Sequence, residues 1–470
     1  MKIRNPRTGI YDYEINILTD AAVNEESSLL RKHQKEWADG GIGKRIEVLQ
    51  EWKNAVEKNK EKLIETLCVD TGRKWETVLE VNLVASSIDR WSSIAKSYLI
   101  GPNQKDSSIP FIKLQQELVP FQLVGVISPW NFPLLLSLID TIPALLAGCA
   151  VIVKPSEVTP RFIKIMEEII SEVPSLKNIL KYIEGEGSVG EALVKACDLI
   201  CFTGSTVTGK KVYETASKKM IPVFLELGGK DPAIVLEGAN IDLAAASILW
   251  GSTANAGQSC LSVERVYVQE NIYDVFLKSL IEKTAAIKLN AENINQGEIG
   301  PIIYEKQVEI INSQLEDALK KGAILLHGNA QCQLIKGGVY CDPTILINVT
   351  HDMKIMQEET FGPIIPIMKF TTKEEAITLA NGTVFGLSAA VFAKTTQEAI
   401  EIGNQIIAGA VSINDCALTA IMHEGEKNSF KLSGIGATRM GASAIKRFMR
   451  QKVFIVKSEE MASPWWYKGN

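Results

Sequence analysis

From Leu123 onward the chain alternates short apolar runs with amphipathic segments, and this alternation restricts the folds open to it. The apolar runs read LVGVIS, AVIVKP, LKYIEG, LICFTGS and PVFLELGG, and helical periodicity lies between them. Strands and helices that alternate at this spacing form βαβ units in a parallel, doubly wound sheet. A second series of the same kind runs from Pro232 to GAVSIN. We therefore expect an α/β fold with two lobes.

The segments before this series predict different structure. From Asp20 to about Ala95, apolar residues recur at helical intervals among Glu and Lys, which is typical of surface helices with one buried stripe. Residues 111–118 (FIKLQQEL) approach alternation and predict an exposed strand or hairpin. We expect no signal peptide, because the first 20 residues lack an apolar h-region after their charges. We expect no membrane span, because the most apolar stretch, residues 134–153, is interrupted by Asp140, Pro143 and Gly148.

Charge and cysteine content argue against several kinds of partner. The 470 residues include 50 Lys and Arg against 55 Asp and Glu, a net charge of -5, so no basic field exists for nucleic acid or an anionic membrane. The 8 cysteines lack the spacing of a disulfide framework, which favours a reducing, cytoplasmic location. Only 4 histidines occur and none is near Cys197 or Cys201, so we expect no metal site.

Two turns with glycine are candidates for binding the phosphates of a dinucleotide. Residues 185–190 (GEGSVG) match the G-x-G-x-x-G fingerprint between a strand and a helix, but no acid for a ribose follows about 20 residues later. The alternative is a turn that needs glycine only for its backbone. Residues 202–210 (FTGSTVTGK) also join a strand to a helix, whose free N–H groups attract anions.

A carboxylate and a thiol lie in contexts that suit acyl chemistry. Glu226 ends an apolar strand beside Gly228 and Gly229, where burial would raise the pKa of a general base. Cys260 follows the small, flexible run ANAGQS, which leaves its sulfur accessible. Either residue alone would be interpreted as a surface acid or a structural cysteine. Their joint presence favours a catalytic pair.

Seven segments, in order along the chain, resemble the aldehyde dehydrogenase superfamily. They are SPWNFP (128–133), KPSE (154–157), FTGS (202–205), LELGGKDP (225–232), GQSC (257–260), EETFGP (358–363) and GLSAAVF (386–392). The resemblance covers nearly the whole chain. It implies three parts: a Rossmann-type cofactor lobe (1–101 and 121–227), an α/β catalytic lobe (228–423) and a small β oligomerisation element (102–120 and 453–470). This element would assemble a homodimer or homotetramer.

The resemblance also implies a reaction. Cys260 would attack the aldehyde, Asn131 would donate a hydrogen bond to the developing oxyanion, and Glu226 would activate the water that hydrolyses the thioester. Members that transfer the acyl group to coenzyme A generally lack this glutamate, so hydrolysis to a carboxylic acid is expected. The hydride would pass to NAD, with NADP as the alternative cofactor.

Cofactor contacts follow from the same resemblance. Lys154 and Glu157 are expected at the adenosine ribose, where Glu157 would repel a 2′-phosphate and so favour NAD. Ser205 is expected at the pyrophosphate, and Gly187 is expected to border the adenine, so that GEGSVG does not hold the phosphates. The full expected set is Ile127, Ser128, Pro129, Trp130, Lys154, Ser156, Glu157, Gly187, Gly190, Phe202, Thr203, Gly204, Ser205, Leu227, Gly228, Glu359 and Phe361, the last two at the nicotinamide end.

The expected substrate pocket consists of Phe132, Leu135, Ile139, Ser259 and Leu261. Semialdehyde-oxidising members often carry Arg at the position of Ile139, so an uncharged, apolar aldehyde is expected. Two residues depart from the family: Asp140 stands where Lys is common, and Arg439 is shifted, both beside the substrate tunnel or the subunit interface. The alternatives are an NADP-preferring semialdehyde dehydrogenase and a cofactor-independent thioesterase or esterase that uses Cys260.

Overall fold

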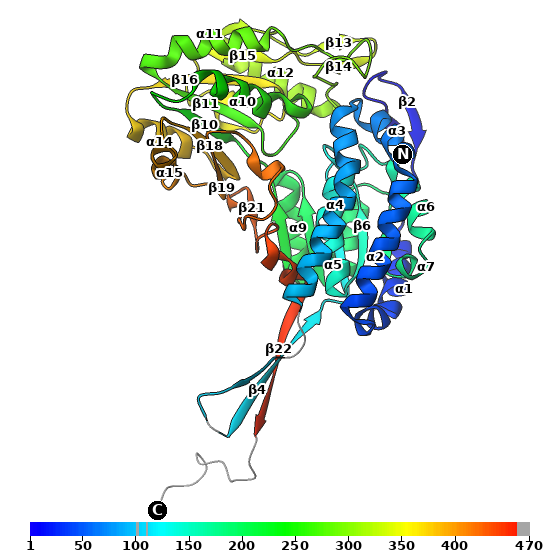
Figure 1. Cartoon of the computed structure of the whole chain (residues 1–470). Coiled ribbons are helices and arrows are strands. Elements are labelled where there is room, and N and C mark those ends of the chain that lie inside the picture. Colours follow the sequence, from blue (N-terminus) through cyan, green and yellow to red (C-terminus); the bar gives the residue numbers. More distant parts are fainter. Residues whose placement is uncertain (100–102, 110, 458–470) are drawn as a thin grey trace, which may run out of the picture.

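The structure is a computed structural model that describes residues 1–99, 103–109 and 111–457 (Figure 1). One lobe contains a six-stranded sheet in the order β21 (Gly434–Ile435), β9 (Val223–Glu226), β8 (Leu199–Thr203), β5 (Leu123–Ile127), β6 (Ala150–Lys154) and β7 (Leu180–Tyr182). All pairs are parallel except the pair of β21 with β9. Strands β5, β6 and β8 are buried throughout, which explains their continuous apolar sequences.

Helices cover this sheet, and the first four account for the helical pattern predicted before Ala95. Trp52 and Trp91, on two of these four helices, are fully buried against the lobe's core. The helices are α1 (Asp20–Asp39), α2 (Gly41–Lys58), α3 (Lys60–Thr71), α4 (Trp75–Tyr98), α5 (Pro133–Ala147), α6 (Phe162–Ser171), α7 (Pro174–Lys177), α8 (Gly187–Ala196) and α9 (Thr206–Lys218). The hairpin of β1 (Lys2–Arg4) and β2 (Tyr11–Glu14) precedes them.

The connections of this sheet diverge at β5. The chain runs from β5 to β6 and β7 on one side, and then returns to the other side of β5 to form β8 and β9. In open α/β sheets, ligands bind outside the carboxyl ends of the strands at the point where the order reverses. The topology therefore places a binding crevice at the ends of β5 and β8.

The second lobe contains a seven-stranded sheet. Its order is β12 (Ile324–His327), β15 (Thr344–Ile347), β16 (Ile364–Phe370), β11 (Val263–Gln269), β10 (Asp231–Val235), β18 (Ser388–Phe392) and β19 (Ala410–Ile413). Only β12, at one edge, pairs antiparallel. The main helices are α10 (Ile241–Thr253), α11 (Tyr273–Thr284), α12 (Glu305–Lys320), α13 (Lys354–Gln357), α14 (Lys373–Asn381) and α15 (Thr396–Gly403). The predicted two-lobed α/β fold is confirmed.

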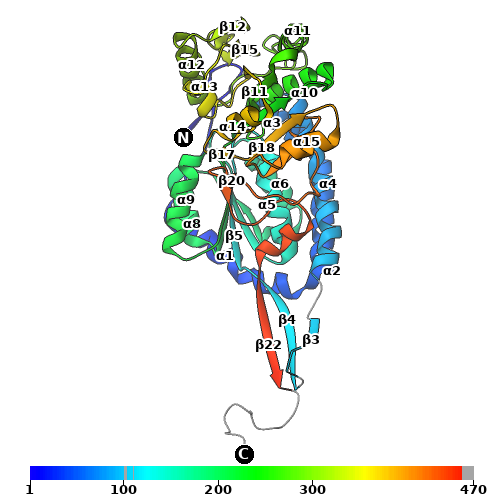
Figure 2. The ribbon, with the colours of Figure 1, turned by 90° about the vertical axis from the view of Figure 1, so that its left-hand side faces the viewer.

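Three strands form an arm that projects from the body of the molecule (Figures 1 and 2). Their order is β22 (Met449–Lys457), β4 (Ile112–Pro120) and β3 (Asn103–Asp106), all antiparallel. The strand and hairpin predicted around residues 111–118 lie here, and β22 begins before Val453, where the expected element starts. Residues 102, 110 and 458–470 of that element, including the aromatic segment 464–467, lie outside the described residues.

One pair of cysteines contradicts the expectation that the chain lacks disulfides. Cys332 and Cys341 form a disulfide across the hairpin of β13 (Gln333–Ile335) and β14 (Gly338–Tyr340). Hairpin pairing brings together two residues whose spacing alone carried no signal.

A further two-stranded sheet joins β17 (Phe385–Gly386) to β20 (Phe430–Lys431). Within the described ranges, no helix is both long and apolar enough to cross a membrane.

Candidate active site

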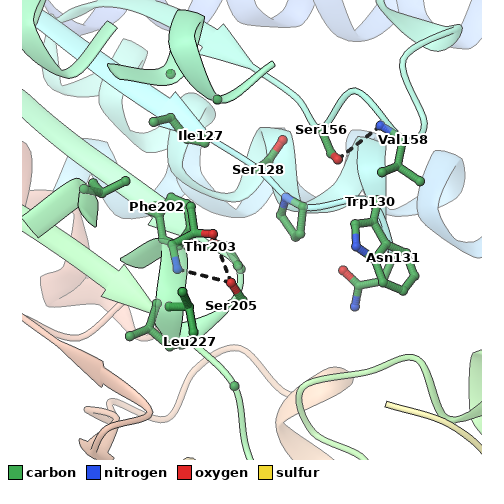
Figure 3. A pocket seen from close by; sticks show the side chains of 18 of the residues that line it. Ile127, Ser128, Trp130, Asn131, Ser156, Val158, Phe202, Thr203, Ser205 and Leu227 are labelled. Carbon is green, nitrogen blue, oxygen red and sulfur yellow. Dashed lines mark hydrogen bonds between the residues drawn. The ribbon is translucent and has the colours of Figure 1, made fainter. Parts of the chain in front are cut away.

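A cavity of about 960 Å³ opens at the carboxyl ends of β5, β6 and β8, where the sheet topology places a crevice (Figure 3). Every residue of the expected cofactor set lines this cavity. Asn131, Glu226 and Cys260 line it as well, although they come from three separate parts of the chain. None of the five expected substrate-pocket residues lines it, whereas Leu136, on the same helix as Leu135, does.

Two helices begin at the wall of the cavity. Helix α8 begins at Gly187, so the third glycine of GEGSVG lies inside the helix, earlier than the expected start at Glu191. A Cβ at Gly187 would meet no atom within 4 Å, because this residue faces open space. Helix α9 is capped by Ser205, whose hydroxyl accepts from the Thr208 N–H at 3.3 Å. The free N–H groups of both helices suit anionic groups in the cavity.

Lys154 and Glu157 lie together at the end of β6. The ammonium of Lys154 donates to Glu157 Oε2 and to the Pro155 carbonyl, each at 3.2 Å. The Lys154 side chain is 5% exposed, whereas that of Glu157 is 31% exposed. The carboxylate of Glu157 therefore remains accessible from the cavity.

The loop that carries Cys260 has an unusual backbone. Asn255, Ala256 and Gly257 adopt positive φ angles of 54°, 55° and 70° in succession. A Cβ at Gly257 would lie 2.3 Å from the Gly362 carbonyl, so only glycine permits this contact between GQSC and EETFGP. Left-handed conformations at non-glycine residues store strain that the surrounding structure must hold, and such residues cluster at functional sites.

Asn131 connects the turn after β5 to the Cys260 loop. Its Nδ2 donates to the Gln258 carbonyl at 3.0 Å, which uses one of the two N–H bonds of the amide. The Asn255 side chain donates to the carbonyls of both Asn131 and Gln258, at 3.1 and 3.0 Å. The second N–H of Asn131 remains to donate to another acceptor near the thiol.

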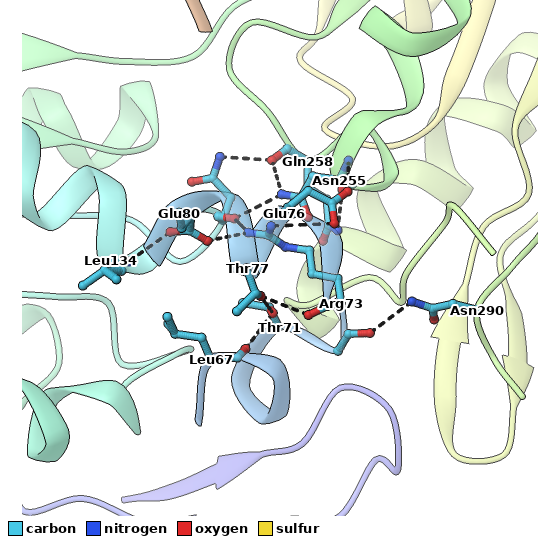
Figure 4. A network of polar contacts seen from close by, with 12 residues as sticks. Leu67, Thr71, Arg73, Glu76, Thr77, Glu80, Leu134, Asn255, Gln258 and Asn290 are labelled. Atoms are coloured by element: carbon cyan, nitrogen blue, oxygen red, sulfur yellow. Dashed lines mark hydrogen bonds and ion pairs between the residues drawn. The ribbon is translucent and has the colours of Figure 1, made fainter. Parts of the chain in front are cut away.

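A buried ion-pair network from the start of α4 supports this junction (Figure 4). Arg73 donates to Glu80 Oε1 at 3.0 Å and to the Asn131 carbonyl. Glu80 Oε2 accepts from the backbone N–H groups of Leu134 and Leu135 at the start of α5, each at 3.1 Å. Burial raises the pKa of Glu80 to about 7, although Arg73 opposes this shift. One helix turn earlier, Glu76 accepts from the Asn255 N–H at 3.1 Å.

The electrostatic surroundings of Cys260 work mostly against ionisation. Burial raises the pKa of its thiol to about 12. Lys427 lowers this pKa, whereas the carboxylates of Glu359, Asp231 and Glu226 raise it. Burial and the neighbouring Glu264 also raise the pKa of Glu359, whose Oε1 accepts from the Gly229 N–H at 3.0 Å. The thiol is therefore mainly neutral in the free protein.

Glu226 lies at the end of β9 with its side chain 17% exposed. Ser429 Oγ donates to Glu226 Oε2 at 2.7 Å, and Lys427 Nζ lies 3.8 Å from the same oxygen. The backbone is fixed too, because Glu226 pairs with Gly434 of β21 and its carbonyl accepts from the Gly204 N–H.

Comparisons with known proteins identify the family of this chain. The model of the family described as "Aldehyde dehydrogenase family" matches residues 1–454. The chain belongs to the aldehyde dehydrogenase family. An Anabaena variabilis protein assigned as aldehyde dehydrogenase PutA is 51% identical, with a TM-score of 0.98 over 100% of both chains. Betaine aldehyde dehydrogenase from Staphylococcus aureus, solved with NAD+, is 29% identical, with a TM-score of 0.92 over 100% of this chain and 93% of that one.

A curated relative is similar over most of the chain. A Mycolicibacterium smegmatis protein assigned as a succinate-semialdehyde dehydrogenase [NADP(+)] is 34% identical over 422 residues, which are 89% of this chain and 81% of the relative. The recognition of the aldehyde dehydrogenase family from the seven sequence segments is confirmed, and so is the assignment of the chain as an enzyme of this family.

Asp140 and Arg439, the two residues that depart from the family pattern, carry opposite charges and form an ion pair with each other. Asp140 is fully buried and forms ion pairs with both Arg439 and Arg447. Arg439 also donates to the Thr203 hydroxyl at the end of β8. Neither Asp140 nor Arg439 lines the described cavity, and their place beside a substrate tunnel or the subunit interface stays a prediction. They join α5 to the segment before β22.

Other residues of this family member's cavity were missed in the sequence. Val194 of α8 and Val207, Lys211 and Val212 of α9 line the wall, on helices that directly follow the motifs. Their helical spacing was a usable signal. Residues near the start of α12, Tyr304, Lys306, Gln307 and Ile310, close the opposite side and belong to no motif. Tertiary packing alone brings these four to the site.

Proposed function

We propose that this enzyme oxidises an aldehyde to a carboxylic acid with NAD as the hydride acceptor. The observation that carries the proposal is the meeting of Cys260, Asn131 and Glu226 in one cavity with the whole expected cofactor set. The residues present fit a dinucleotide, because the crevice is open at Gly187 and two helix N-termini face it. Lys154 and Glu157 would hold the adenosine ribose, Ser205 the pyrophosphate and Glu359 the nicotinamide ribose. When bound, NAD supplies the hydride acceptor.

The chain's own residues would carry the covalent steps. The Cys260 thiol loses its proton to solvent, and the thiolate sulfur attacks the carbonyl carbon. The oxyanion accepts from the free N–H of Asn131 and from the Cys260 backbone N–H. One donor of this kind is worth about 3 kcal/mol of barrier. After hydride loss a thioester remains on Cys260, and Glu226 takes a proton from the water that attacks it. The carbon–sulfur bond then breaks to release the acid.

Replacement of Cys260 by serine tests this proposal. We expect NADH production from NAD and an aldehyde to fall to background, because serine at this position lacks a comparable nucleophile. The melting temperature should stay near that of the wild type. Substantial NADH production by a folded Cys260→Ser variant would rule out the thiol mechanism. A hydrolase that works without NAD, the alternative from the sequence, would instead form product in its absence.

For the substrate, we propose an uncharged, apolar aldehyde. The support is that Leu135, Leu136 and Ile139, the partly exposed residues of α5 near Asn131, carry no charge. A semialdehyde with NADP is the second candidate, favoured by the named activity of the Mycolicibacterium smegmatis relative. A panel of linear, aromatic and carboxylate-bearing aldehydes, each tried with both cofactors, separates the two. The highest kcat/KM for succinate semialdehyde with NADP would overturn our choice.

We also propose that residues 1–101 and 121–227 bind the cofactor, that 228–423 complete the catalytic lobe, and that the arm assembles a homodimer or homotetramer. The exposed apolar side chains of Val453, Phe454, Ile455 and Val456 on β22 support assembly. Light scattering tests the assembly, and a monomer at micromolar concentration would contradict it.

A cytoplasmic location is proposed from the six cysteines outside the disulfide. Cell fractionation tests this location.

A further inference from the structure

The carboxylate of Glu226 is engaged at only one of its oxygens. The Ser429 hydroxyl and the Lys427 ammonium both approach Oε2, at 2.7 and 3.8 Å. Among the described residues, no hydrogen-bond donor engages Oε1. These contacts fix the orientation of the carboxylate and leave Oε1 available to accept a hydrogen bond or a proton.

The segment that carries Lys427 and Ser429 is followed by two short strands, each paired with a strand that is distant in the sequence. Strand β20, which begins directly after Ser429, pairs with β17 of the second lobe, and β21 pairs with β9 beside Glu226. The Lys427 N–H donates to Thr438 Oγ1 at 3.1 Å. These attachments fix the segment relative to Glu226, so the two side chains approach the carboxylate from a rigid support.

Lys427 is nearly enclosed, with its side chain 10% exposed. In the described part of the chain, the charged groups that act most strongly on the Cys260 thiol are Lys427, Glu359, Asp231 and Glu226; of these four, Lys427 is the cation. Its effect on the thiol is favourable to ionisation, whereas that of each carboxylate is unfavourable. Lys427 therefore acts on both the base and the nucleophile of the proposed reaction.

We propose that Lys427 and Ser429 are positioning residues for thioester hydrolysis, because they fix Glu226 through Oε2 and leave Oε1 to take the proton of the attacking water. This inference rests on the proposed function of Glu226. In the step, the water oxygen bonds to the acyl carbon while one of its protons passes to Oε1. The carbon–sulfur bond then breaks, the proton returns from Glu226 to the Cys260 sulfur, and the carboxylic acid leaves.

Stopped-flow measurement of NADH tests this inference in the full-length enzyme. In Lys427→Met and Ser429→Ala we expect a burst of about one NADH per Cys260, because hydride transfer precedes hydrolysis. A steady state slower than the wild type by roughly 10-fold to 100-fold should follow, since the base is misplaced. Lys427→Arg should restore part of the steady-state rate, because it keeps the positive charge.

Two further measurements separate positioning from a general structural effect. Lys431→Met is a matched control, because Lys431 lies on β20, only two residues after Ser429, but its ammonium donates to the carbonyls of Asn381 and Thr383. It should keep the wild-type ratio of burst to steady state. Alkylation of Cys260 by iodoacetamide should be slower in Lys427→Met and unchanged in Ser429→Ala, since serine brings no charge.

The outcomes for this inference differ from those for the proposed function. Glu226→Gln serves as the reference for lost base function and should show the burst. If it does, and both Lys427→Met and Ser429→Ala keep the wild-type steady state, the inference is wrong and the proposed function stands. If the wild type reduces NAD with no aldehyde of the panel, the proposed function is wrong, and the positioning role is overturned with it.

Discussion

At the scale of single residues, Cys260 is a half-buried thiol that must ionise to react. Burial raises its pKa to about 12, and three carboxylates add to the shift. Its thiolate fraction should therefore grow with pH throughout the neutral and mildly alkaline range. These surroundings are tested in the enzyme without aldehyde or cofactor, because neither ligand is then present to change the pKa of the thiol.

We expect alkylation of Cys260 by iodoacetamide to accelerate by about tenfold for each pH unit between roughly pH 7 and pH 10, because the pKa lies above this range. Mass spectrometry of the Cys260 peptide measures this rate separately from the half-buried Cys68. A plateau already reached near pH 8 would mean that the thiol ionises more readily than its surroundings indicate.

Gly187 offers a second test at this scale. A valine here would place its side chain in open space inside the cavity, at the expected adenine end. We expect Gly187→Val to weaken NAD binding about tenfold or more, measured by calorimetry, while Cys260 alkylation stays unchanged. Gly43→Val is the control, because a Cβ at Gly43 on α2 also meets no atom within 4 Å and lies away from the cavity. Lost thiol reactivity with normal NAD affinity would refute the assignment.

At the scale of elements, Asp140 links α5 to the segment before β22. Removal of its charge leaves Arg439 and Arg447 buried without their ionic partner. We expect Asp140→Asn to lower the free energy of unfolding by about 3–5 kcal/mol, measured by urea denaturation. Asp140→Lys should destabilise the protein further, even though lysine is common here in the family. Wild-type stability in both variants would show that the ion pairs contribute nothing.

The elements also show which parts of the site were visible in the sequence. Ile127, Lys154 and Thr203 end buried apolar strands, so their neighbours could be placed at one edge of the sheet from pattern and motif. Lys427 and Ser429 could not be placed, because they follow no periodic segment and reach Glu226 only through the pairing of β21 with β9. The Cys332–Cys341 bond likewise depends on a hairpin whose short strands left no clear signal.

At the scale of the whole molecule, the fold brings the proposed base, nucleophile and oxyanion donor from three separate parts of the chain to one cavity. The sequence order of the seven motif segments predicted this family and fold, and six of the seven contribute residues to the cavity, whereas GLSAAVF spans the buried strand β18. The substrate end was less predictable, since none of the five expected pocket residues lines the described cavity.

The arm permits a prediction at the same scale. Ile455 is 68% exposed on β22, within a run of apolar side chains. We expect Ile455→Lys to shift the enzyme toward smaller assemblies in light scattering, because a charge on this strand would oppose strand pairing between subunits. Lys452→Glu, which changes a charged residue on the same strand, is the control. An unchanged assembly in Ile455→Lys would show that subunits associate elsewhere.

The most direct test of the account is intact-protein and peptide mass spectrometry of Glu226→Gln, quenched after reaction with NAD and an aldehyde that the wild type oxidises. The account predicts an acyl group on the Cys260 peptide, formed in about one equivalent together with one NADH, because hydride transfer occurs while hydrolysis is blocked. NADH formed without an acyl group on Cys260, or an acyl group on another cysteine, would contradict it.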